Sequence, residues 1–105
     1  MSHSEAAVST DRPARYGKQL VAHLGRRHGG EWLDEERRGT IDLGTGRADV
    51  SCSPDALLIR LECPAESVAQ LEDVVGRHLV RFGARDELVV RWVREGGEPG
   101  SEQRT

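Results

Sequence analysis

The sequence lacks a long apolar segment and an excess of basic residues. No run approaches the roughly 18 apolar residues that a membrane-spanning helix needs. Residues 1–12 contain no apolar stretch like that of a secretory signal, so we expect a cytoplasmic protein without membrane contacts. The 15 Lys and Arg residues are outnumbered by 18 Asp and Glu residues, which gives a net charge of −3. A mildly acidic chain is poorly suited to nucleic-acid phosphates, and we expect no nucleic-acid partner.

Motifs of catalytic and metal chemistry are also missing. The sequence has two cysteines, no Cys-x-x-Cys and no His-Glu-x-x-His. Its glycine pairs do not lead from a strand into a helix as a phosphate-binding loop does, and no serine lies in a Gly-x-Ser-x-Gly elbow. We therefore predict no cofactor, no metal and no catalytic residue, and we consider a binding protein better supported than an enzyme.

The length of 105 residues fits one domain. Residues 1–5 and 95–105 are polar, and the second segment contains several glycines and a proline. We interpret both segments as disordered tails. The remaining residues, 6–94, are then expected to form a single α+β domain.

Two segments have the apolar spacing of an amphipathic helix. In residues 12–27, Tyr16, Leu20 and Leu24 recur at four-residue intervals. In residues 64–82, one stripe of apolar residues is formed by Val68, Leu71, Val75, Leu79 and Phe82. Each predicted helix therefore has one face to bury against another layer.

Alternation of apolar and polar residues predicts four short strands between the helices. A short turn joins the last two strands and fixes their pairing: Cys52 with Leu57, Val50 with Ile59, and Ala48 with Leu61. This register places the apolar side chains on one face of the sheet. It also places Cys63 about 20 Å along the strand from the partner of Cys52, beyond the reach of a disulfide. We therefore predict two free thiols.

The sequence contains no internal repeat, and two further strands complete the fold. One short strand is expected before the first helix and one at residues 88–93, which gives the order (β)αββββαβ. The last strand is apolar on both faces, because Val93 lies opposite the face of Val90 and Trp92. The simplest arrangement is a two-layer sandwich, an antiparallel sheet with two helices on one face.

Four side chains on or next to the predicted helices are candidates for ligand binding: Tyr16, His23, His28 and His78. A groove between the helices could be lined by Tyr16, His23 and His78. On a single helix, His23 and His28 would point about 140° apart and could not share a metal ion. A metal site of His28, His78 and Cys52 remains open only if the fold brings these residues together.

The order and spacing of several short motifs also resemble a known family. These motifs are Thr10-Asp11-Arg12-Pro13-Ala14-Arg15-Tyr16, Gln19-Leu20, His23, His28, Pro64-Ala65-Glu66, Leu71-Glu72-Asp73-Val74-Val75, His78-Leu79, Arg81-Phe82, Glu87-Leu88 and Val90-Arg91-Trp92. Over residues 6–94 they resemble a bacterial family catalogued as domain of unknown function 2218. Gly17 departs from the family pattern, which has a large apolar residue there. The resemblance implies a small bacterial protein without an assigned activity, with related domains found beside siderophore-interacting flavin reductases.

Three hypotheses about function follow. We favour a non-catalytic accessory module that binds a small ligand or a protein, linked by the resemblance to siderophore-iron metabolism. The alternative is a small metal-dependent protein or enzyme that uses His28, His78 and Cys52. A homodimer through an exposed sheet face or edge is the third, because the last strand is apolar on both faces. The sequence leaves the identity of the ligand or partner open.

Overall fold

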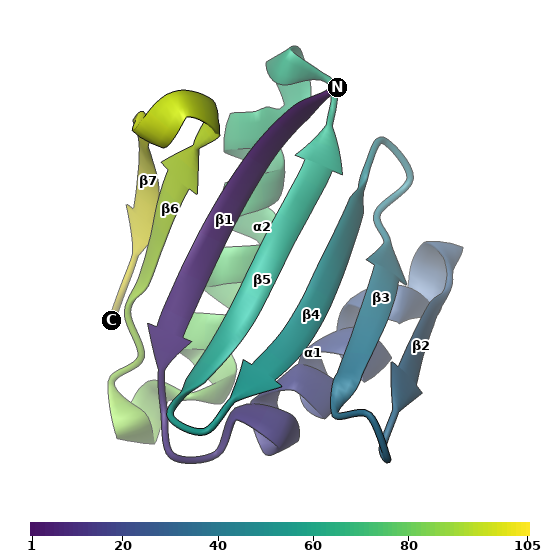
Figure 1. Cartoon of the computed structure of the whole chain (residues 1–105), viewed down its shortest axis with the longest axis vertical. Helices are drawn as coiled ribbons and strands as arrows, with labels where there is room; N and C mark the ends of the chain where they lie inside the picture. Colours follow the sequence, from purple (N-terminus) through teal and green to yellow (C-terminus); the bar gives the residue numbers. More distant parts are fainter.

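The computed structural model of the chain describes all of residues 1–105 and confirms the α+β fold (Figure 1). Its strands and helices follow in this order: β1 (Ser2–Ser9), α1 (Pro13–His28), β2 (Gly30–Leu33), β3 (Arg38–Asp42), β4 (Arg47–Ser53), β5 (Ala56–Cys63), α2 (Val68–Phe82), β6 (Val90–Arg94) and β7 (Pro99–Gln103). Three 3-10 turns are present: η1 (Ala65–Ser67), η2 (Ala84–Asp86) and η3 (Glu95–Gly97). Neither α-helix is long and apolar enough to cross a membrane.

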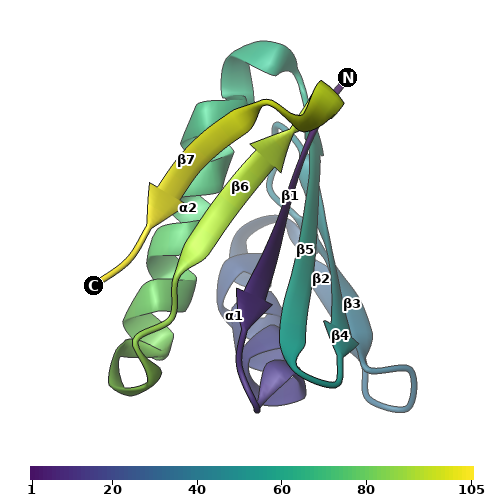
Figure 2. The same cartoon turned by 60° about the vertical axis from the view of Figure 1, so that its left-hand side comes forward.

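The seven strands form one antiparallel sheet in the order β2-β3-β4-β5-β1-β6-β7. Both helices lie on the same face of this sheet, as predicted, and the opposite face is open (Figures 1 and 2). β6 lies between β1 and β7 and is not an edge strand. At this end of the sheet, β7 lies beside α2 (Figure 2).

The pairing of β4 with β5 agrees with the register expected from the sequence. Cys52 pairs with Leu57, and the two pairs beyond it also match: Val50 with Ile59, and Ala48 with Leu61. Because a shift of one residue would turn the apolar side chains away from the helices, the alternation was enough to specify this hairpin. Both cysteines are free thiols, as predicted.

The two terminal segments differ from the expected disordered tails at residues 1–5 and 95–105. Residues Ser2–Ser9 form β1, which pairs with β5 along its whole length in the middle of the sheet. Pro99–Gln103 forms β7, which pairs with β6. The domain therefore extends beyond residues 6–94. Its C-terminal strand β7 is held by polar contacts that composition does not reveal.

The core lies between the sheet and the two helices and contains a cluster of 20 buried apolar residues. Gly17 lies on the buried face of α1, where the ring of Trp32 from β2 takes the place of a side chain. A Cβ atom on Gly17 would lie 2.9 Å from the Trp32 ring and 3.1 Å from Cδ1 of Leu57. The departure from the family pattern at Gly17 therefore does not leave the helix loosely packed, because Trp32 fills the space.

Candidate functional site

The structure brings together two of the four sequence candidates, His23 from α1 and His78 from α2. Their ring centroids are 5.1 Å apart, and the ring planes meet at 47°. Phe82 packs edge-on against this pair, with its ring centroid 5.2 Å from that of His23 and 6.4 Å from that of His78. His23 is exposed and His78 is half-buried, so solvent reaches the pair.

The other two candidates lie elsewhere. Tyr16 is buried, and its hydroxyl donates a hydrogen bond to the carboxylate of Asp86 in η2, a contact that raises the pKa of the phenol. His28 is exposed at the end of α1, where its ring lies close to Gly44. The expected groove lined jointly by Tyr16, His23 and His78 is thus reduced to the two histidines and Phe82.

The alternative metal site of His28, His78 and Cys52 is not assembled. No group of three or more His, Cys, Asp or Glu side chains in the chain is arranged to hold a metal ion. Burial raises the pKa of the Cys52 thiol, although the nearby Arg37 acts in the opposite direction. The thiol form of Cys52 is therefore favoured over the thiolate that would bind a metal or act as a nucleophile.

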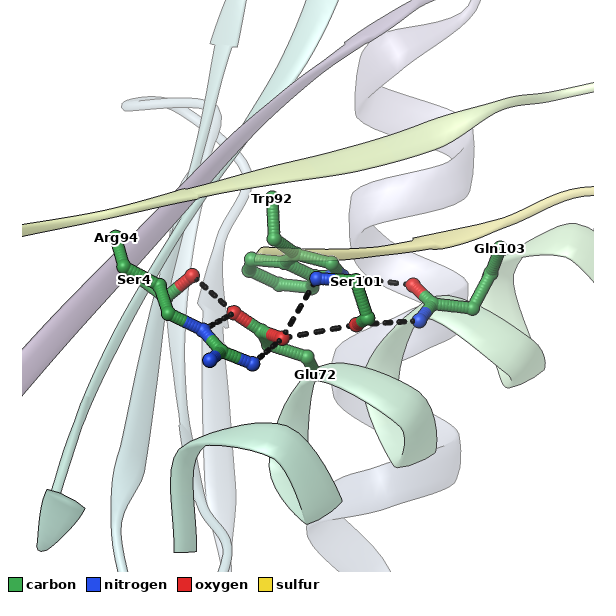
Figure 3. Close-up of polar contacts among 6 residues, drawn as sticks. All are labelled: Ser4, Glu72, Trp92, Arg94, Ser101 and Gln103. Atoms are coloured by element: carbon green, nitrogen blue, oxygen red, sulfur yellow. Dashed lines mark hydrogen bonds and ion pairs between the residues drawn. The ribbon is translucent and has the colours of Figure 1, made fainter. Parts of the chain in front are cut away.

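A buried carboxylate lies between α2 and the sheet, although its place beside Asp73 in the sequence favours a solvated pair. Glu72 is 0% exposed, and Arg94 of β6 binds it through two hydrogen bonds of 2.8 and 3.0 Å (Figure 3). The hydroxyl of Ser4 donates to one carboxylate oxygen at 2.6 Å. The backbone N–H and the hydroxyl of Ser101 in β7 donate to the other at 3.1 and 2.8 Å. Glu72 thus joins β1, β6 and β7 to α2.

These contacts make Glu72 a structural anion. Burial raises its pKa, but the hydrogen bonds from Arg94, Ser4 and Ser101 outweigh that effect and hold the pKa at about 2. Five donors occupy the two carboxylate oxygens, and no buried side-chain polar atom in the chain lacks a hydrogen-bond partner. A signal was present in the sequence, because Glu72 lies on the same helical face as Val68 and Val75.

The open face of the sheet is hollowed over its central strands β1, β4, β5 and β6. This open-face hollow has a volume of about 640 Å³. Ala7, Leu58 and Val93 provide apolar surface in it, and the side chains of Leu58 and Val93 are 38% and 50% exposed. Large apolar groups exposed on a sheet face are a recognised mark of binding surfaces.

Charged side chains of both signs also line the open-face hollow: Glu5, Asp49, Arg60 and Arg91. Glu5 is the pairing partner of Val93 on one side and of Arg60 on the other. The guanidinium of Arg60 lies 3.4 Å from the Glu5 carboxylate, within an exposed ion pair. Glu5 therefore lies between Val93 and Arg60, and charged and apolar side chains alternate across the hollow.

The sequence contains a signal for this surface. Leu58 alternates with the buried residues Leu57 and Ile59, so its side chain had to lie on the opposite face. Val93 was noted as part of a second apolar face. That Leu58 on β5 and Val93 on β6 share one central surface, however, depends on β1 lying between their two strands.

Comparisons with known proteins give one family and one related structure. A sequence model described as an uncharacterized protein conserved in bacteria (DUF2218) matches residues 5–93, from β1 into β6. The NMR structure of PA4090 from Pseudomonas aeruginosa has a TM-score of 0.68 and 30% sequence identity, and the match covers 93% of this chain and 99% of that chain. A search of the curated proteins gave no match.

Proposed function

Since the chain belongs to the DUF2218 family of uncharacterised bacterial proteins, we propose its function from its own geometry: it is a non-catalytic binding module that holds a small amphipathic ligand on the open face of its sheet. The observation that carries this proposal is the open-face hollow, where exposed Leu58 and Val93 lie among charges of both signs. The family match confirms the resemblance found in the sequence and assigns no reaction.

The size of the hollow supports a small molecule as the occupant. Its volume of about 640 Å³ lies within the roughly 300–1,000 Å³ that is usual for sites of small ligands. The lining combines apolar surface with a few charged groups, which is the composition by which such sites orient a ligand. An apolar segment of the ligand would cover Ala7, Leu58 and Val93.

The charged residues of the open-face hollow indicate which polar groups its ligand would carry. Glu5 and Asp49 would attract a cationic group, and Arg60 and Arg91 would attract an anionic group or an acceptor oxygen. Arg60 and Arg91 already form exposed ion pairs, with Glu5 at 3.4 Å and with Glu102 at 2.7 Å. Exposed pairs of this kind contribute only about 0.2–1 kcal/mol, so a ligand can replace them at low cost.

A narrower form of the proposal places this ligand in siderophore-iron metabolism. Its support is the occurrence of related domains beside siderophore-interacting flavin reductases, which the family resemblance implies. A linear hydroxamate siderophore also has the required chemistry, because it combines apolar methylene segments, acceptor oxygens and a terminal ammonium group. Its metal complex is therefore the first ligand to test.

The experiment is an NMR titration of the ¹⁵N-labelled, untagged protein with the gallium complex of desferrioxamine B, followed by flavin mononucleotide and haem. We expect the largest shift changes at Ala7, Leu58 and Val93. Leu58→Glu would weaken binding by at least about tenfold, because a buried Leu side chain contributes about 1.5–3 kcal/mol. Gln70→Glu is the matched control, since Gln70 is exposed on α2, which covers the other face of the sheet, and should leave binding unchanged.

Several results would overturn the proposal. If no ligand of the panel shifts any resonance, the module does not bind this class of molecule. If the shifts map instead to α1 and α2, the binding site lies on the helical face. If light scattering shows a dimer that Leu58→Glu dissociates, the open face is occupied by a second copy of the chain.

A further inference from the structure

The geometry of His23 and His78 points to a second site: we infer that these two residues form a binding site for a divalent transition-metal cation, with Zn²⁺ as the reference ion, between α1 and α2. The site is separate from the open-face hollow, because the helices cover the other face of the sheet (Figure 2). The inference does not depend on the proposed function.

The separation of the two rings agrees with a shared tetrahedral ion. Zn²⁺ binds an imidazole nitrogen at about 2.0–2.1 Å, which places the ring centroid about 3.2 Å from the ion. At the tetrahedral angle, two such rings have centroids about 5.2 Å apart. The observed separation between His23 and His78 is 5.1 Å. The spacing of the two rings therefore matches that of two imidazole ligands on one tetrahedral ion.

One hydrogen bond prepares His78 as a metal ligand. Its Nδ1 lies 2.7 Å from the backbone carbonyl oxygen of Val74, one turn earlier in α2. A carbonyl only accepts, so Nδ1 carries the proton and donates, and Nε2 keeps its lone pair. Metal-binding histidines usually donate their other ring N–H in this way, which fixes the tautomer and the orientation of the ring.

The second ring and the access route also suit a cation. His23 is exposed on a regular helix, and no hydrogen bond or ion pair involves its ring nitrogens. Phe82 packs edge-on against it at 5.2 Å and limits the positions that the ring can take. Because the chain supplies two ligands, water would occupy the other coordination positions, and the site is open and exchangeable.

Paired aromatic rings can have the same spacing without any metal, so the experiment must separate the two cases. Untagged protein is titrated with Zn²⁺ by isothermal calorimetry, and the histidine ring signals are followed by NMR. We expect one ion per chain and shifts confined to the rings of His23 and His78. Imidazole ligands also favour Cu²⁺ over Zn²⁺, so Cu²⁺ should bind more tightly at the same rings.

Single substitutions test both ligands. His23→Ala should lower the Zn²⁺ affinity by at least about tenfold, since even supporting groups around a metal contribute about 10–100-fold. His78→Asn should do the same, because Asn can still donate to the Val74 carbonyl but lacks Nε2. His28→Ala on the same helix and His3→Ala near the N-terminus are the controls, and both should bind as the unchanged protein does.

The outcome is decisive in either direction. Equal weakening by His23→Ala and His78→Asn, with both controls unchanged and all variants folded by NMR, supports the two-histidine site. The inference is overturned if Zn²⁺ binding is unchanged in either His23→Ala or His78→Asn. It is also overturned if the unchanged protein shows no Zn²⁺ binding, in which case the two rings are only packed against each other.

Discussion

Replacement of Glu72 by glutamine tests the role assigned to the buried carboxylate. The variant Glu72→Gln keeps the size of the side chain and removes its charge. Its amide NH₂ would face donors of Arg94, Ser4 or Ser101, and the Arg94 guanidinium would lose its anion. Removing one partner of a buried ion pair costs about 3–5 kcal/mol of unfolding free energy, and we expect a loss of this size at pH 7.

The pH dependence of the unfolding free energy gives a second magnitude for the stabilisation by ionised Glu72. The pKa of Glu72 is lowered from 4.5 to about 2 in the folded protein. At 1.36 kcal/mol per unit, this difference stabilises the fold by about 3 kcal/mol when the carboxylate is ionised. Because the folded pKa is the lower one, this contribution is present above pH 4.5 and is lost as the pH falls toward 2. Glu72→Gln should lack this acid-dependent decrease.

The assay is urea unfolding followed by circular dichroism at several values between pH 7 and pH 2.5. Asp73→Asn is the matched control, because the neighbouring Asp73 forms an exposed pair with Arg77 at 2.6 Å. This control should lose no more than about 0.5 kcal/mol. A loss below about 1 kcal/mol for Glu72→Gln at pH 7, or the same pH slope as the unchanged protein, would refute the reasoning.

Three further predictions concern residues in or beside the hydrophobic core. Gly17→Ala should lower the free energy of unfolding by about 1 kcal/mol, because crowding in the core exceeds the gain of up to ~1 kcal/mol in helix propensity; a stabilised variant in urea melts would contradict this. Tyr16→Phe should lower the free energy of unfolding by about 1 kcal/mol at pH 7, because it removes the hydrogen bond to Asp86. In the unchanged protein, ultraviolet absorbance should show that the phenol ionises above the usual pKa of 10.0. The stabilisation from this Tyr16 contact is present below that pH and is lost as the pH rises further. Burial raises the pKa of both Cys52 and Cys63, so a thiol reagent at pH 7 should react slowly with the native protein. In urea the same reagent should label two thiols per chain. Rapid labelling of the native protein would be inconsistent with this prediction.

Much of the fold could be predicted because its apolar residues follow the period of each element. The alternation in β4 and β5 left one register that buried Val50 and Ile59 together, and the structure has that register. The segment that forms β7 has no such pattern. Ser101 and Gln103 hold this segment through polar contacts with Glu72 and Trp92. Composition alone assigns the same segment to a disordered tail.

The candidate sites were less predictable because they depend on how elements lie relative to one another. His23 and His78 were both identified as candidates, but their approach depends on the placement of α1 beside α2. The open-face hollow likewise requires β1 to separate β5 from β6, so that Leu58 and Val93 lie on the same central surface. Spacing along the chain contains no information about either arrangement.

The central position of β1 has a consequence for the synthesis of the protein. β1 leaves the ribosome before both of its neighbours, β5 and β6, so it stays without a partner until β5 emerges. During this interval its buried-face residues Ala6 and Val8 are exposed in an unpaired strand, which is the kind of segment that chaperones protect and aggregates recruit. The nascent chain can assemble the β2–β5 meander early, but β1 can join it only after β5 has emerged.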